Sequence, residues 1–182
     1  MTQQVFERNI KDLLTAIEGC LNKQLIAPSL LLLYAGIDIM AWLDRPESHA
    51  DVKRADFINW VENYLLPGSG LVCNALDLYA ARCALLHSYA AESPLSRQGD
   101  AKQIFYAWGS ARAEDLQRLV DFVGTHSAVA VHVNELLKAF RVGVERFEKA
   151  LSHDSQHATL VYHRATKFFS NMPTMRVETG LA

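Results

Sequence analysis

The sequence has few residues that interrupt helices and few that could form a covalent framework. Its 182 residues include five prolines, nine glycines and three cysteines. So little proline and glycine leaves long stretches free to be helical. The cysteines are odd in number and form no CxxC pair, which excludes a small disulfide-stapled scaffold and predicts reduced, buried thiols of a cytosolic protein.

The sequence also lacks an excess of charge of one sign and a long hydrophobic run. Its net charge is −2, which argues against a surface coated in positive charge for non-specific nucleic-acid binding but allows a small local site. The longest apolar run, Leu30–Leu43, has 14 residues and contains Asp38, whereas a membrane span needs about 20. The N-terminus carries charges from Glu7 onward and has no signal-peptide pattern. We therefore expect a core helix at 30–43, no membrane partner and a cytoplasmic location.

What the sequence does have is apolar periodicity over most of its length. Half of its residues are hydrophobic, enough for a buried core, and the length fits one domain of about 100–200 residues. Spacings of three and four predict helices at about 3–26, from Pro28 to Leu43, from a cap at Asp51 to Leu65, 71–91, 112–124 with Leu116, Leu119, Val120 and Val123 inward, 134–151, and from a cap at Asp154 to about 170.

Two segments depart from the helical pattern. Residues 103–108 are aromatic and β-branched, and residues 127–133 have a similar strand-like composition, so each segment predicts a short strand that could pair with the other. We expect a mainly α fold, a compact bundle of six or seven helices with a short two-stranded β ribbon. Residues 1–172 form its single domain, and residues 173–182 are expected to be a flexible tail.

The segment richest in chemical information is Leu78–Ser93. Arg82 and His87 are the only Asp, Glu, Lys, Arg or His residues between Asp77 and Glu92, within an otherwise apolar helix. Five residues at 100° each place the two side chains about 140° apart around the helix. This spacing predicts that they flank one broad face, and that a second copy of the helix would help both reach one phosphate.

An arginine followed after four to six residues by a histidine, near the end of a central helix, is the hallmark of the HEPN superfamily of nucleotide-binding helical domains. Arg82-Cys-Ala-Leu-Leu-His87 resembles this motif with a spacer of four. The family commonly has a polar residue after the arginine, where this sequence has Cys83. The specific motif covers six residues, while the helical layout is similar over roughly residues 1–170.

The resemblance implies a metal-independent endoribonuclease, a toxin or defence effector, that works as a homodimer without a cofactor. It assigns proton transfer to His87 and phosphate binding to Arg82, with RNA as substrate and an antitoxin or another protein as a further partner. Tyr79 and Ser88 lie near the motif and are supporting candidates for orienting a phosphate. The chemistry is reasonable because RNA carries its own nucleophile, histidine titrates near neutrality and the guanidinium fork fits phosphate oxygens.

A second interpretation needs no catalysis. An arginine and a histidine five residues apart occur in many helices, and Arg82 could instead pair with Asp38 or Asp77 while His87 occupies a helix end. The chain would then be a non-catalytic helical binding or assembly module.

Three histidines near the C-terminus form another cluster, His153, His157 and His163. The first two have the i,i+4 spacing that can chelate zinc. However, the third lies about 120° from the direction of His157, and no further ligand is evident. We favour a solvated helix face and expect no metal site, although the surplus of basic residues over 138–182 could also steer RNA.

Overall fold

The chain is helical over most of its length. A computed structural model describes residues 2–124 and 127–167, without the side chains of Thr2 and Ser88. The described elements are α1 Thr2–Asn22, α2 Ile26–Asp44, α3 Arg54–Trp60, the π-helical turn η1 Val61–Leu65, α4 Ala75–Ser88, α5 Pro94–Arg97, β1 Gln103–Ala107, α6 Ala113–Val123, β2 Ala128–His132, α7 Val133–His153 and α8 Ser155–Ala165. The prediction of a mainly α fold with two short strands is confirmed. The described residues form eight α-helices rather than six or seven, because the loop at 92–100 contains the four-residue α5.

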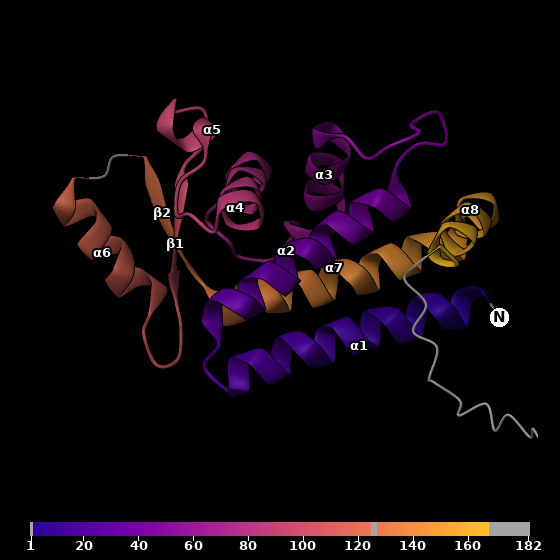
Figure 1. Cartoon of the computed structure of the whole chain (residues 1–182), viewed down its shortest axis with the longest axis horizontal. Helices are drawn as coiled ribbons and strands as arrows, with labels where there is room; N and C mark the ends of the chain where they lie inside the picture. Colours follow the sequence, from indigo (N-terminus) through magenta and orange to yellow (C-terminus); the bar gives the residue numbers. More distant parts are fainter. Residues whose placement is uncertain (1, 125–126, 168–182) are drawn as a thin grey trace, which may run out of the picture.

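Helix α2 lies at the centre of the bundle. It contacts α1, α3, α4, α7 and α8 (Figure 1), and the side chains of Leu33, Ile37 and Met40 are fully buried. By length and composition it is the one helix of the described residues that could cross a membrane, and half of its apolar stretch is buried inside the fold. This burial is that of a core helix, as the sequence predicts.

Two long amphipathic helices, α1 and α7, lie along α2 (Figure 1). Phe6, Ile10 and Ile17 of α1 are buried, as their spacing predicts. Helix α8 follows α7 after a single residue, Asp154, whose carboxylate accepts a hydrogen bond of 2.9 Å from the backbone N–H of His157. The predicted cap at Asp154 is thus confirmed.

The predicted cap of the third helix at Asp51 is wrong. The helix begins three residues later, at Arg54, where the Asp56 carboxylate accepts a hydrogen bond of 2.7 Å from the backbone N–H of Lys53. A carboxylate at the third position of a helix binds this otherwise unpartnered N–H group, which fixes the start of the helix.

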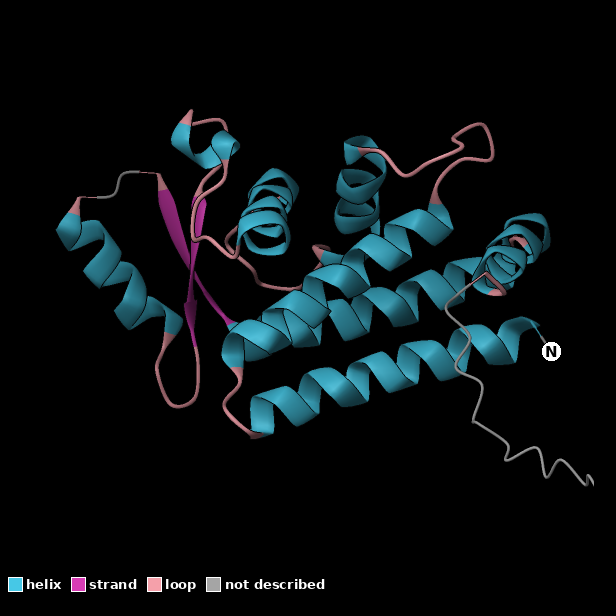
Figure 2. Ribbon diagram, in the orientation of Figure 1, coloured by secondary structure: helices cyan, strands magenta, loops and turns pink. Residues whose placement is uncertain are grey.

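The two strands form a parallel pair, with Gln103 opposite Ala128 and Ala107 opposite His132. Helix α6 connects them, and the sheet lies between α4 and α6 (Figure 2). Val120 of α6 is buried, but Leu119 and Val123 are 58% and 68% exposed, so the prediction that both point inward is wrong. The reason is that α6 lies at one end of the molecule and packs mainly against β1 and β2, which are too narrow to cover its whole apolar face.

Close packing at the centre of α2 yields a test of the core. A Cβ atom added to Gly36 would lie 2.8 Å from Cζ of Phe140 and 3.0 Å from Cδ2 of Leu13. Phe140 is fully buried, so its ring has little room to move. We expect Gly36→Ala to lower the free energy of unfolding by about 1–3 kcal/mol in urea titrations.

Gly19→Ala in α1 is the matched control, because no atom lies within 4 Å of its added Cβ. Relief of the entropic cost of glycine in a helix should raise the free energy of unfolding there by about 0.5–1 kcal/mol. Equal effects of the two substitutions would contradict the packing described here.

Candidate active site

The start of α4 is fixed by a reciprocal cap and not by its apolar pattern. The Asn74 side chain accepts from the backbone N–H of Asp77 at 2.9 Å, and the Asp77 carboxylate accepts from the N–H groups of Asn74 at 3.0 Å and Lys102 at 2.7 Å. The predicted start at Leu71 is therefore four residues too early. Asp77 therefore already has partners within the fold. Its hydrogen bond from Lys102 joins the segment before β1 to α4, the helix that carries Arg82 and His87.

Arg82 binds Asp38 of the neighbouring α2. Its Nε donates to Oδ2 of Asp38 at 2.7 Å, and both side chains are about one-fifth exposed, at 21% and 23%. Burial raises the pKa of Asp38 above its ordinary value, while the hydrogen bond and charge of Arg82 act in the opposite direction. Of the two structural partners considered for Arg82, the structure selects Asp38.

His87 contacts Arg82 within the same chain. Nη1 of Arg82 and Nε2 of His87 lie 2.9 Å apart. A guanidinium can only donate, so Nε2 accepts and the ring proton of this arrangement is on Nδ1. Arg82 and His87 start about 140° apart around the helix, but the arginine side chain is long enough to reach the imidazole. One copy of the helix therefore brings both groups together. The Nη2 group of Arg82 has no partner among the described residues and is available to a ligand.

Cys83 and Tyr79 lie beside this network, and the ring of Tyr79 is engaged in packing. Sγ of Cys83 accepts a long contact of 3.9 Å from Nη1 of Arg82. The Tyr79 ring packs edge-on against Phe57 at 5.4 Å, with the guanidinium of Arg54 5.4 Å from its centre. Burial, and next the neighbouring Cys83, raises the pKa of Tyr79. Tyr79 is therefore placed as a packing residue, while the side chain of Ser88 lies outside the described residues.

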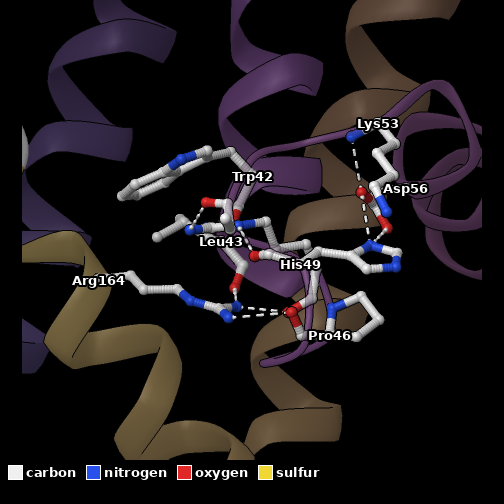
Figure 3. A network of polar contacts seen from close by, with 9 residues as sticks. Trp42, Leu43, Pro46, His49, Lys53, Asp56 and Arg164 are labelled. Atoms are coloured by element: carbon white, nitrogen blue, oxygen red, sulfur yellow. Dashed lines mark hydrogen bonds and ion pairs between the residues drawn. The ribbon is translucent and has the colours of Figure 1, made fainter.

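The C-terminal histidines belong to another region, where α8 meets the end of α2. His157 pairs with Asp44 at 3.2 Å, and the nearly buried Arg164 donates to the backbone oxygens of Leu43 at 2.7 Å and Pro46 at 3.4 Å (Figure 3). Within residues 2–124 and 127–167, no three His, Cys, Asp or Glu side chains are grouped as metal ligands. The contact between His157 and Asp44 joins α8 to the end of α2.

A pocket of about 420 Å³ opens beside His87, between the end of α4 and the segment that contains α5. Glu92 and Arg97 lie on its rim. The sequence pattern singles out neither of these two residues, because their only signal is a position within ten residues of the motif histidine. Comparison with protein-family models, curated proteins and solved structures finds no match to this chain.

The Asp38–Arg82 pair yields a prediction about pH. Arg82→Met removes the group that opposes the effect of burial, so the pKa of Asp38 should rise further above its ordinary value. A carboxyl with a raised pKa in the folded state is destabilising when ionised, so the substitution should cost more stability at neutral pH than at about pH 5. Carbon-13 NMR titration of the Asp38 carboxyl and urea unfolding at both pH values measure the two effects.

Arg118→Met is the control, since Arg118 is an exposed residue of α6 that pairs with Asp115 at 3.2 Å. It should leave the Asp38 titration unchanged. A lower or unchanged pKa of Asp38 in Arg82→Met would show that Arg82 does not stabilise the ionised carboxylate.

Proposed function

We propose that the chain is a metal-independent endoribonuclease of the HEPN type. The observation that carries this proposal is the Asp38–Arg82–His87 network on two central helices, with the His87 side chain exposed and a pocket beside it. The network combines a fixed cation, which can bind a phosphate, with an imidazole whose accepting nitrogen can take a proton. These are the two groups that cleavage of RNA at its own 2′-hydroxyl requires.

In the proposed reaction, a phosphate oxygen binds the unpartnered Nη2 of Arg82 and then Nη1, which releases Nε2 of His87. Nε2 accepts the proton of the 2′-hydroxyl as the 2′-oxygen attacks phosphorus and the bond to the 5′-oxygen breaks. His87 of another copy of the chain, in its protonated imidazolium form, gives a proton to the departing 5′-oxygen and becomes neutral. The products are a 2′,3′-cyclic phosphate and a 5′-hydroxyl.

Asp38 acts in this proposal as a positioning residue. Its hydrogen bond to Nε holds the guanidinium in the place where Nη1 lies 2.9 Å from Nε2 of His87. A pair of copies would supply the second histidine, which makes the composite homodimer of the HEPN resemblance part of the proposal. A cytoplasmic toxin or defence role, with an antitoxin or another protein as inhibitor, follows from the same resemblance.

A second candidate function is a non-catalytic binding or assembly module. Its specific support is that Arg82 and His87 already satisfy each other and Asp38 without a ligand. In that case the network would only fix the rotation of α4 against α2. Cleavage measurements separate the two candidates.

The direct test is cleavage of labelled, structured RNA by the purified chain in EDTA. We expect a 2′,3′-cyclic phosphate product and a loss of about 10²–10⁴-fold in rate for His87→Ala, because a general acid–base group contributes that much. Arg82→Ala should also lose activity, since it removes the phosphate contact. RNA with a 2′-deoxy substitution at the cleaved position should remain intact.

His153→Ala and Arg118→Ala are matched controls, because they remove an exposed histidine and an exposed arginine from other helices. Both should cleave as the unmodified chain does. An inactive unmodified chain, or folded Arg82→Ala and His87→Ala variants with full activity, would overturn the proposal and favour the binding module.

The oligomeric state provides a separate test. Sedimentation at the concentrations that cleave RNA should give twice the chain mass of 20.4 kDa, because each site needs an imidazole from a second copy. A monomer that cleaves RNA at the full rate would contradict the composite site and leave the single-chain network as the catalyst.

A further inference from the structure

The pocket beside His87 has walls of two different kinds. Cys83 and Ala84 of α4 line it together with Pro94 and Leu95, so part of its surface is small and apolar. The remaining wall carries charged or imidazole side chains, and its volume of about 420 Å³ falls in the range of ~300–1,000 Å³ of small-molecule sites. A ligand with a flat apolar part and an anionic part matches both walls.

Arg97 supplies a free cation on this rim. Its side chain is exposed and has no hydrogen bond, ion pair or ring contact within the described residues. Two other arginines, Arg82 and Arg54, do have partners. Arg82 pairs with Asp38, and the guanidinium of Arg54 lies over the Tyr79 ring. An unpartnered guanidinium that lines the same pocket as His87 is suited to bind a phosphate group.

The segment that carries Arg97 is held in place by several backbone contacts. Ser93 is buried, and its hydroxyl accepts from the N–H of Ser96 at 3.3 Å. The N–H of Asp100 donates to the backbone oxygen of Leu95 at 3.0 Å. The side-chain amide of Gln103 donates to the backbone oxygen of Ala91 at 3.2 Å. These hydrogen bonds connect the segment that carries Arg97 internally and to β1, and they define the position of its backbone.

We propose that this pocket binds the nucleotide next to the cleaved phosphate, with the base on the apolar wall and the neighbouring phosphate on Arg97. This inference rests on the proposed cleavage of RNA and adds a binding residue that the motif does not contain. Glu92, on the same rim, can accept a hydrogen bond from a base amino group but would repel a second phosphate. The pocket therefore suits a nucleotide better than a free polyphosphate.

Binding can be measured without cleavage, with adenosine 3′-monophosphate as the probe. Titration calorimetry and NMR should show binding by the unmodified chain, with shifts at Cys83, Ala84 and Leu95. Arg97→Ala should weaken binding at least about tenfold, because it removes a charged hydrogen bond to phosphate. Inorganic phosphate should bind more weakly and shift Arg82 and His87 without those apolar-wall residues.

Arg8→Ala is the matched control, an exposed arginine of α1 with no partner in the described residues, and it should bind the probe normally. In cleavage assays Arg97→Ala should raise KM more than it lowers kcat, and Arg97→Lys should restore part of the loss. For RNA binding by the inactive His87→Ala chain, Arg97→Ala should also reduce the salt slope by about one.

The outcomes separate this inference from the proposed function. RNA cleavage that is unchanged in Arg97→Ala, with unchanged probe binding, would overturn the nucleotide pocket and leave the nuclease standing. Probe binding that depends on Arg97 in a chain that cleaves no RNA would support the pocket and overturn the nuclease. Equal binding of the probe and inorganic phosphate would overturn the role of the apolar wall.

Discussion

The bond between Asp38 and Arg82 is the constraint on which the rest of the site depends. Asp38 interrupts the most apolar helix of the chain, and a carboxylate in that position is costly unless it is paired and hydrogen-bonded. Arg82 meets this need from α4 at 2.7 Å. The pairing joins α4 to α2, while the other end of the same guanidinium reaches His87 at the surface.

Packing alone does not require such a pair. Replacement of a buried ion pair by well-packed apolar residues is often neutral or stabilising by about 1–4 kcal/mol, and most residues of α2 and α4 are apolar. The pair is also about one-fifth exposed, so it borders the solvent. In the proposed nuclease, this charge pair holds a guanidinium beside an imidazole and a pocket.

Apolar spacing is sufficient to predict the amphipathic helices α1 and α7, and the residue types at 103–108 and 127–133 are sufficient to predict the two strands. Residue pattern is insufficient where a helix cap, or the number of elements that cover a helix, decides which residues are helical or buried. Asn74 fixes the start of α4 although apolar residues precede it, and Leu119 and Val123 are exposed because α6 lies at one end of the molecule. The motif residues were predicted, but the contact between Arg82 and His87 depends on side-chain length, which a helical angle does not include.

The most direct test of this account is the state of the His87 imidazole, followed by long-range proton–nitrogen NMR at about pH 8. In the free protein, Nδ1 should carry the proton and Nε2 should be the accepting nitrogen. Addition of a 2′-O-methyl RNA, which cannot be cleaved, should shift Nε2 as Arg82 turns to phosphate, while the six other histidines serve as internal references. A protonated Nε2 in the free protein, or a His87 spectrum that RNA leaves unchanged, would contradict the account.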